Sequence, residues 1–508
     1  MSSRNWCLLW SPRLDAAVAM VFLLACGCLV LGAETGSLAS IPWPNIVLVL
    51  ADDLGWGDLS CYGHPRLRTP NLDRLARQGT LFTQFYVNGS VCSPSRCAIM
   101  TGQYPARHRI HGHYADHAQN AARGMSNWLD PKTPNLASVL KSAGYATGHV
   151  GKWHLGHGQG APQPTAYGFD MARAMVCANP AWTEPAETFW AKSNAVFVDE
   201  AIRFIRQYKD QPFFLNVWTL VPHAPLNPTE EQMKPYERFS WGRGVRHKSA
   251  ETIYYASVGD LDAQVGRLVA EIDALGLAQK TLVIFTSDNG PEDIHISNAG
   301  HSGVGSAGPF RGRKRSLYEG GVRVPFLVRW PGHVPAGRID DASVLSGVDL
   351  LPTLGKLAGI EPPAGHLLDG EDASDILLGA TRPRRMPLMW EWRFRVFGEP
   401  FHRSPILAIR EGDWKLLLNP DRSRVELYDI PRDPTELNNL APCQPELVGR
   451  LAEKVLAWQK TLPPGPIEAE AGRNDYPWPG KAIAPPKAAP AKRKPSPPKS
   501  KRPAPAPQ

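Results

Sequence analysis

The chain has 508 residues, of which 43% are hydrophobic, 49 are proline and 45 are glycine. This length exceeds one ordinary single-core domain but suits a large α/β domain with a smaller domain beside it. The formal net charge is +8, yet residues 481–508 hold eight cations and no acid, so the remainder is neutral overall. This distribution argues against nucleic acid as a partner of the folded part.

The two ends of the chain differ from the rest in composition. Residues 466–508 are rich in proline and lysine, which predicts a disordered tail that cannot bury a core. At the other end, Arg4 and Arg13 precede an apolar stretch, so residues 1–33 are predicted to be a secretory signal peptide. We therefore expect an exported protein, periplasmic, extracellular or in a lysosome-like compartment, with no stable membrane span after cleavage. An uncleaved leader, or lipidation at Cys26, would instead anchor it to a membrane.

Five cysteines follow the predicted signal peptide: Cys61, Cys92, Cys97, Cys177 and Cys443. Disulfides are common in exported proteins, and an odd number of cysteines leaves at least one thiol unpaired. We expect this thiol at Cys92.

Four apolar stretches, each followed by polar residues, are typical of buried strands: 45–50, 145–150, 213–220 and 282–285. They predict an α/β fold with a mostly parallel central sheet and helices on both faces, one of which starts near Ser249. In such sheets the ligand site lies beyond the carboxyl ends of the strands. We assign this catalytic domain to residues 42–381. The short strands and the helix at 445–459 that follow predict a smaller α+β subdomain with an antiparallel sheet at 382–465.

Oxygen ligands follow two of these strands, which lie far apart in the sequence. Asp52 and Asp53 come after the first strand, and Asp288 and Asn289 come after another. A single aspartate in a loop usually caps a helix, but two such pairs at strand ends favour a metal site. Hard oxygen donors without histidine or thiolate select Ca²⁺, with Mg²⁺ as the alternative, over zinc.

Several motifs in this order resemble the sulfatase family. CSPSR, from Cys92 to Arg96, matches the sulfatase signature Cys-x-Pro-x-Arg in full, and GYATGHVGKWHLG at 144–156 resembles the second signature. ADDLGWGD, VPHAP, TSDNG, LYEGGVRVP and ELYDIPRDPTELNNLA extend the resemblance from about residue 44 to residue 462. The chain is similar to formylglycine-dependent type I sulfatases of the arylsulfatase A and N-acetylgalactosamine-6-sulfatase type, which implies an alkaline-phosphatase-like fold.

The resemblance implies that a formylglycine-generating enzyme converts Cys92 to Cα-formylglycine. One hydroxyl of the hydrated aldehyde would attack sulfur, and the other would expel sulfate as the aldehyde reforms. The Ca²⁺ ion would be held by the formylglycine oxygen and the four residues at the strand ends: Asp52, Asp53, Asp288 and Asn289.

The same resemblance implies roles for the polar residues around Cys92. Arg96 would hold the formylglycine hydroxylate, and Lys152 would bridge it to a sulfate oxygen. His154 would take the proton from the second hydroxyl, and His223 would face the leaving oxygen. Lys314 would bind the sulfate.

Two features of the sequence are less typical of the family. Arg313 and Arg315, on either side of Lys314, depart from the small residues usual there. Another motif, RHRIHGHY, holds three histidines that are equally compatible with solvent exposure and with contact to a sugar: His108, His111 and His113.

The resulting functional prediction is a sulfuric ester hydrolase acting on an aryl sulfate or a sulfated saccharide, for example a galactosamine or galactose sulfate. Two alternatives remain open at the level of sequence. One is a phosphonate monoester hydrolase or phosphodiesterase of the same superfamily. The other is a catalytically silent glycan-binding protein in which Cys92 stays unmodified.

Overall fold

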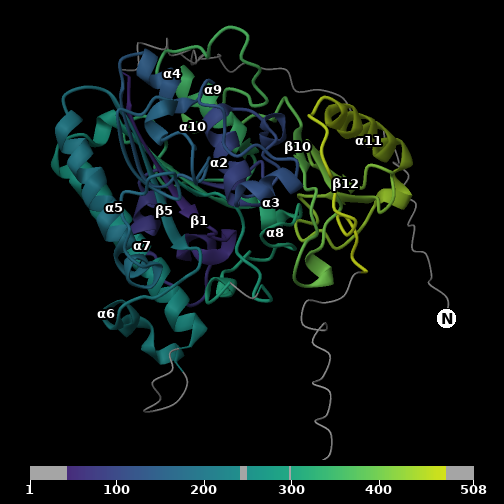
Figure 1. Cartoon of the computed structure of the whole chain (residues 1–508), viewed down its shortest axis with the longest axis horizontal. Coiled ribbons are helices and arrows are strands. Elements are labelled where there is room, and N and C mark those ends of the chain that lie inside the picture. The colour runs from purple at the N-terminus through teal and green to yellow at the C-terminus, as the bar shows by residue number, and fades with distance from the viewer. Residues whose placement is uncertain (1–42, 241–248, 297–298, 476–508) are drawn as a thin grey trace, which may run out of the picture.

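The computed structural model of the chain describes residues 43–240, 249–296 and 299–475. The predicted signal peptide and residues 476–508 of the predicted tail lie outside these ranges. The described residues form a large sheet flanked by helices and a smaller, separate sheet near the C-terminus (Figure 1). In this part of the chain, no helix is both long and apolar enough to cross a membrane.

The large sheet has the order β4-β3-β5-β1-β6-β7-β2-β8, with β9 paired to β2. All neighbouring strands run parallel except β7, which is antiparallel to both β6 and β2. The mostly parallel sheet predicted from the sequence is therefore confirmed. Its strands are β1 (Asn45–Asp52), β2 (Thr80–Tyr86), β3 (Ala146–Lys152), β4 (Met171–Met175), β5 (Phe213–Pro222), β6 (Thr281–Ser287), β7 (Arg323–Arg329), β8 (Arg338–Asp340) and β9 (Leu345–Ser346).

The central strand β1 is covered on both faces. Ile46 and Leu48 belong to the core on one side of the sheet, and Val47 and Val49 belong to the core on the other side. Because successive side chains point to opposite faces, a strand buried on both faces reads as a continuous apolar run. The polarity changes only at Asp52, where β1 ends.

Helices cover both faces of the large sheet. One core includes side chains of α2 (Cys92–Thr101), α4 (Leu136–Ser142) and α9 (Leu350–Leu357). The opposite core includes side chains of α1 (Pro70–Arg77), α5 (Ala186–Tyr208) and α7 (Ala250–Ala274). Ser249 caps α7 by accepting a hydrogen bond from the backbone N–H of Thr252, so the predicted start of this helix is confirmed. The shorter α-helices are α3 (His117–Ala122), α6 (Glu230–Met233), α8 (Glu319–Val322) and α10 (Ser374–Leu377).

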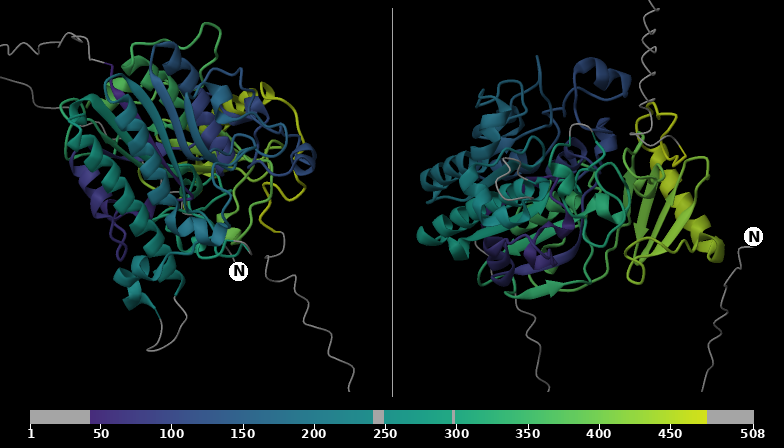
Figure 2. Two further views of the ribbon diagram at one scale, coloured as in Figure 1. Left: turned by 60° about the vertical axis from the view of Figure 1, so that its left-hand side comes forward. Right: turned by 90° about the horizontal axis from the view of Figure 1, so that it is seen from below.

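The small sheet is antiparallel, in the order β10-β11-β12-β13, as the sequence predicts. Helix α11 (Pro445–Lys460) packs against its central strands through Leu451 and Val455. Figure 2 shows this sheet and α11 as a unit beside the large sheet. The strands are β10 (Leu388–Glu391), β11 (Leu407–Glu411), β12 (Trp414–Leu418) and β13 (Glu426–Asp429).

The chain beyond α11 stays in contact with the small domain further than the sequence predicts. The carbonyl of Gly472 accepts hydrogen bonds from Arg424 Nη1 and Asn419 Nδ2, and Ala471 is buried. The tail boundary placed at residue 466 is therefore too early for residues 466–475. These contacts are hydrogen bonds to the backbone, which composition does not reveal.

A buried ion-pair cluster joins the small sheet to the large domain. Lys415 Nζ lies 2.9 Å from Glu319 Oε1 and 3.0 Å from Glu436 Oε1, and all three side chains are fully buried. Glu319 is the first residue of α8 and also accepts a hydrogen bond from Tyr86 in the large sheet. A charge on β12 thereby fixes the helix that follows the loop carrying Lys314.

Four of the described cysteines form no disulfide, unlike what export suggests. Cys61, Cys92, Cys97 and Cys177 all carry free thiols. Cys92 is unpaired as expected. Because Cys61, Cys97 and Cys177 are unpaired too, the odd number of cysteines does not single out Cys92.

Candidate active site

The predicted functional residues gather at the carboxyl edge of the large sheet. β1, β3, β5 and β6 end there beside the N-terminus of α2, around a cavity of about 370 Å³. The cavity is lined by acidic, basic and histidine side chains with a few apolar ones: Asp52, Asp53, Cys92, His113, Lys152, His154, Val176, Trp190, Leu220, His223, Ala224, Pro225, Glu292, Ala299, Lys314 and Arg315.

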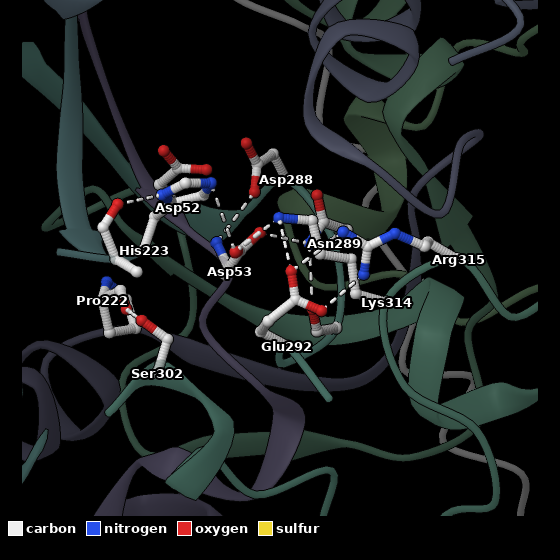
Figure 3. A network of polar contacts seen from close by, with 12 residues as sticks. Asp52, Asp53, Pro222, His223, Asp288, Asn289, Glu292, Ser302, Lys314 and Arg315 are labelled. Atoms are coloured by element: carbon white, nitrogen blue, oxygen red, sulfur yellow. Dashed lines mark hydrogen bonds and ion pairs between the residues drawn. The ribbon is translucent and has the colours of Figure 1, made fainter. Parts of the chain in front are cut away.

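The four predicted oxygen ligands are buried and adjacent. The backbone N–H of Asp53 donates to Asp288 Oδ1 at 3.1 Å, and Asn289 Nδ2 donates to Asp53 Oδ1 at 2.7 Å. Figure 3 shows Asp53 at the centre of this group, with Asp52, Asp288 and Asn289 around it. Two parallel neighbours, β1 and β6, bring these residues together by ending at the same edge.

Arg96 is fully buried beneath this group. Its Nη1 donates to the carbonyl oxygen of Lys152 at 2.8 Å, and its guanidinium Cζ lies 5.1 Å from the centre of the Trp218 ring. Burial opposes the charged form, but Asp288 and Asp52 hold the pKa of Arg96 above its usual value. Arg96 is therefore a permanent cation that positions its neighbours.

Two lysines bind the carboxylates that follow β1. Lys152 Nζ donates to Asp52 Oδ2 at 2.5 Å, and Lys314 Nζ donates to Asp53 Oδ2 at 2.6 Å. Lys314 also lies 3.4 Å from Glu292 Oε2. Burial lowers the pKa of Lys314, but Asp53 and Glu292 outweigh it and raise the pKa above its usual range. Both lysines thus remain charged inside the cavity.

The formal charges of the site cancel. Four acids and four cations face one another there: Asp52, Asp53, Asp288 and Glu292 with Arg96, Lys152, Lys314 and Arg315. An anionic substrate gains little from a neutral site. A divalent cation would give the cavity the positive charge that it needs to hold an anion.

The oxygen atoms of the site fit such a cation. Asp52 Oδ1 and Asn289 Oδ1 are buried, and neither has a hydrogen-bond partner among the described residues. Ligand atoms of Asp52, Cys92 and Asp288 lie within 4.8 Å of one another. Buried polar atoms are normally satisfied, so these two oxygens are available as ligands, and oxygen donors are the ligands that Ca²⁺ and Mg²⁺ prefer.

Cys92 is the first residue of α2, and only 2% of it is exposed. Burial raises the pKa of its thiol, although Lys152 and Lys314 act in the opposite direction. Because the thiolate is the reactive form, an unmodified Cys92 is a poor nucleophile at neutral pH. Its position at a helix N-terminus nevertheless suits an anion-binding centre.

The two predicted histidines both line the cavity that contains Cys92. His154 Nε2 is 3.2 Å from the carbonyl oxygen of Tyr114, and burial together with Lys152 lowers the pKa of His154 well below its usual value. His223 Nδ1 is 2.6 Å from the carbonyl oxygen of Ala224, and burial followed by Lys314 lowers its pKa to about 4. Because Nδ1–H of His223 donates to that carbonyl, Nε2 is the atom that faces the cavity (Figure 3).

Four residues of the cavity have left-handed backbone conformations that favour glycine. Their φ angles are 67° at Asp53, 54° at His154, 54° at Val176 and 75° at Arg315. Each such residue costs about 1–3 kcal/mol, and this strain persists where the surrounding structure requires it, notably at functional sites.

The structure adds residues that sequence reasoning missed. Glu292 forms ion pairs with Lys314 and Arg315. Its position three residues after Asn289 is the sequence signal that could have pointed to it. Of the three undecided histidines, His113 lines the cavity. His108 instead contacts Gln103, and His111 lies 3.6 Å from Glu391 Oε2.

Comparison with known proteins identifies the family. The model of the Sulfatase family matches residues 44–360. The chain belongs to the sulfatase family. A second model, described as N-sulphoglucosamine sulphohydrolase, C-terminal, matches residues 308–460 of this sulfatase.

The curated relatives are sulfuric ester hydrolases. Arylsulfatase A of Homo sapiens is 36% identical over 428 residues, which cover 76% of this sulfatase and 77% of the relative. N-acetylgalactosamine-6-sulfatase of Canis lupus familiaris is 34% identical over 422 residues, which cover 76% of this sulfatase and 74% of the relative. The sulfatase is therefore a sulfuric ester hydrolase.

Solved structures share the fold. The crystal structure of Ps i-CgsB superposes with a TM-score of 0.69 at 27% identity, covering 82% of this sulfatase and 93% of that chain. Phosphonate monoester hydrolase of Agrobacterium radiobacter superposes with a TM-score of 0.59 at 23% identity, covering 82% of this sulfatase and 96% of that chain. The second likeness shows the fold alone.

Proposed function

We propose that this sulfatase hydrolyses sulfate esters of a sulfated carbohydrate, such as a galactosamine or galactose sulfate, with Cys92 converted to formylglycine and Ca²⁺ bound beside it. The observation that carries the proposal is the position of Cys92. It lies at the N-terminus of α2, in one cavity with the carboxylates of Asp52 and Asp53 and the ammonium groups of Lys152 and Lys314.

Formylglycine supplies what the buried thiol lacks. Its hydrate offers two hydroxyls on one carbon, one to attack sulfur and one whose deprotonation releases sulfate. Because Cys92 is 2% exposed, a formylglycine-generating enzyme must reach it before the fold is complete. The surrounding residues then act on a nucleophile that is already in place.

The Ca²⁺ ion would be held by Asp52, Asp53, Asp288 and Asn289. When bound, it supplies positive charge that acidifies the attacking hydroxyl and neutralises the sulfate. Arg96 keeps Asp288 oriented toward this position through its two hydrogen bonds to Oδ2. The role of Arg96 is therefore to position a ligand and to add charge.

Lys152 and Lys314 bind the sulfate group. Both Nζ atoms lie in the cavity, and both lysines are held on aspartates that a divalent cation would also bind. Charge-assisted hydrogen bonds to sulfate oxygens are stronger than neutral ones, so two lysines in one cavity would hold the sulfate group in place. The N-terminal amides of α2 add to the same positive field.

The histidines move protons. His154 is neutral because of its burial and the nearby lysine, so it is able to accept the proton of the second hydroxyl as sulfate leaves. His223 presents Nε2 to the cavity and faces the leaving oxygen of the substrate alcohol.

The predicted signal peptide supports an exported enzyme. Sulfated polysaccharides are large and strongly charged, so an enzyme outside the cytoplasm meets them without a transport step. Cleavage near Ala33 would be seen as the N-terminus of the mature protein.

The test compares three nitrophenyl substrates at equal concentration: the sulfate, the phosphate and the phenylphosphonate. We expect the sulfate to give the highest kcat/KM, and a mass shift from cysteine to formylglycine at the Cys92 peptide. A preference for phosphonate would instead identify a phosphonate monoester hydrolase. Full-length protein with an unmodified Cys92 and no turnover of any ester would identify a silent glycan-binding protein. A panel of defined sulfated saccharides then identifies the sugar.

A further inference from the structure

A second cavity adjoins the catalytic one. It has a volume of about 420 Å³, and two of its lining residues, His113 and Arg315, also line the catalytic cavity. It lies between the two domains, because its walls come from the loops near α3, the loop before α8 and the segments after β10 and α11. Figure 1 shows α3 and α8 beside the small domain. A molecule whose sulfate sits at Cys92 extends into this second cavity if it continues past His113 and Arg315.

Three arginines line the second cavity, and each is placed on an aromatic ring. We call this set the basic groove: Arg123, Arg315, Phe394, Arg395 and Phe397. The Cζ atom of Arg123 lies 5.5 Å from the centre of the Phe394 ring. Arg315 and Arg395 both lie on the Phe397 ring. Their Cζ atoms are 6.0 and 4.2 Å from its centre, respectively. A guanidinium on a ring face is held in place while its N–H groups remain available for hydrogen bonds.

Two of these cations have no carboxylate partner. In residues 43–240, 249–296 and 299–475, no ion pair involves the side chain of Arg123 or of Arg395. Two acids also line the groove, Glu468 and Glu470. Glu468 Oε2 accepts from the backbone N–H of Arg395 at 2.8 Å, so one of its oxygens is already engaged. Glu468 and Glu470 balance Arg123 and Arg395 in formal charge, since Arg315 is paired with Glu292. Among the described residues, no carboxylate engages the guanidinium N–H groups of Arg123 and Arg395.

Arg315 connects the two cavities and does so in a strained conformation. Its φ of 75° lies in the left-handed region, where a residue with a side chain is disfavoured and glycine is usual. Its guanidinium binds Glu292 in the catalytic cavity at 2.5 Å and also faces Phe397 in the groove. Strain of this kind at a side chain that joins two cavities indicates a binding role.

We propose that the basic groove is a subsite for a second oxyanion, a sulfate or a carboxylate, on the sugar next to the one whose sulfate ester is cleaved. This inference rests on the proposed function and specifies its substrate class as an oligosaccharide with more than one anionic group. The planar guanidinium presents parallel N–H donors that match two oxygens of a sulfate or a carboxylate. The rings of Phe394 and Phe397 keep the arginines in place before the substrate binds, which reduces the entropy lost on binding.

The experiment uses the full-length enzyme with Arg123→Ala and Arg395→Ala. Four substrates are compared: 4-nitrophenyl sulfate, a monosulfated neutral disaccharide, the same disaccharide with a second sulfate, and one with a uronate in that position. We expect each variant to lower the ratio of kcat/KM for the better dianionic disaccharide to kcat/KM for 4-nitrophenyl sulfate by about tenfold. The dianionic disaccharide that wild type prefers identifies the oxyanion.

Arg432→Ala is the matched control. Arg432 is an arginine of the small domain with an 85% exposed side chain, paired to Asp429, and it lines neither cavity. Its removal deletes the same charge, so the substrate ratio should stay that of wild type. A ratio that is unchanged in both groove variants, or that falls equally in the control, overturns the subsite.

A binding measurement separates this inference from the proposed function. In full-length Cys92→Ala protein, calorimetry with the dianionic disaccharide should show about tenfold weaker binding when Arg395→Ala is added. Wild type that hydrolyses 4-nitrophenyl sulfate while the groove variants keep the wild-type ratio refutes the subsite and leaves the proposed function standing. Wild type that hydrolyses no sulfate ester refutes both. Because Arg123 and Arg395 lie on different segments, a folding defect in one variant leaves the other to decide.

Discussion

Arg96 donates from Nε and Nη2 to one and the same oxygen of Asp288, Oδ2, at 2.9 and 2.7 Å. Both side chains are fully buried, and the remaining nitrogen of Arg96 bonds the carbonyl at the end of β3. The arginine that closes the CSPSR motif thus ties α2 to the ends of β6 and β3. Its first task is geometric, because it fixes the carboxylate that lies beside Cys92.

Arg96→Ala should reduce both stability and turnover. Removing one partner of a buried ion pair leaves an uncompensated charge, which costs about 3–5 kcal/mol of unfolding free energy. Arg96→Lys keeps the charge but has all its donors on one nitrogen instead of a planar guanidinium, so it should recover part of the stability and little of the activity. Urea unfolding and turnover of 4-nitrophenyl sulfate measure the two effects. Wild-type turnover by Arg96→Lys would show that geometry at Asp288 is unimportant.

Cys92→Ala should abolish sulfatase activity while the protein stays folded. The substitution removes the proposed nucleophile but only one buried atom, so the loss of unfolding free energy should be about 1 kcal/mol. Cys92→Ser should give at most one turnover, since a serine ester of sulfate has no second hydroxyl to expel it. Burst kinetics and intact mass distinguish these outcomes. Sustained turnover by either variant would contradict the formylglycine proposal.

Chelation of divalent cations should lower turnover by orders of magnitude, and Ca²⁺ should restore it better than Zn²⁺. A cation that binds the folded state also stabilises it, by about 2.7 kcal/mol at a concentration a hundred times its Kd. Asp52→Asn should weaken both effects, whereas Asp475→Asn, at a side chain that is 64% exposed, should not. Thermal unfolding with and without Ca²⁺ gives a readout that is independent of activity. Full activity in chelator would remove the cation from the proposal.

Much of the large sheet could be predicted because its strands are buried on both faces. β1, β5 and β6 begin and end within a few residues of the apolar runs at 45–50, 213–220 and 282–285. The antiparallel direction of β7 was not predictable, since direction depends on where the connection crosses the sheet. The contacts of residues 466–475 were missed because they are made to backbone groups, which leave no periodic pattern.

The proposed site, like the sheet, could be predicted from the sequence only in part. Its residues follow strands, and a parallel sheet brings strand ends together, so the cluster around Asp53 could be anticipated from the sequence. The basic groove could not, because Arg123, Arg315 and Arg395 come from loops in three parts of the chain that meet only when the small domain docks. A loop residue has no periodicity that identifies its neighbours.

His149 should make the stability of the enzyme depend on pH. It lies in β3 among aromatic rings, with the Trp153 and Trp218 centroids at 5.1 and 5.2 Å, and burial followed by Arg96 lowers its pKa to about 3. Below pH 6.5 the unfolded chain takes up a proton that the folded state refuses, so stability falls as pH falls through this range. From pH 6.5 to pH 5 this single group should cost about 2 kcal/mol.

The His149→Phe variant tests this assignment through the slope of unfolding free energy against pH. Any packing change caused by phenylalanine is the same at every pH, so urea unfolding at pH 7 and pH 5 isolates the proton. Between pH 7 and pH 5, the unfolding free energy of the variant should fall by about 2 kcal/mol less than that of wild type. Equal slopes for wild type and His149→Phe would show that His149 does not titrate differently in the two states.

Lys415→Met should weaken both the fold and the catalytic loop. Lys415 lies between the Glu319 and Glu436 carboxylates in a fully buried cluster, and it is the main cation that lowers the pKa of Glu319 to about 2 against the effect of burial. Without it two carboxylates face each other, and breaking such a pair costs about 3–5 kcal/mol. Glu319 begins α8, five residues after Lys314, so turnover of 4-nitrophenyl sulfate should fall even below the unfolding temperature.

Two further variants show whether the Lys415 cluster causes that loss. Adding Glu436→Gln to Lys415→Met removes one of the opposed charges and should recover part of the unfolding free energy. Lys454→Met removes a lysine of the same domain whose side chain is 44% exposed and paired to Glu411, so it should change stability by about 1 kcal/mol or less. Urea unfolding of all three variants, with KM for 4-nitrophenyl sulfate measured in parallel, gives the comparison. If Lys415→Met matches Lys454→Met in both stability and KM, the cluster does not couple the small domain to the loop that carries Lys314.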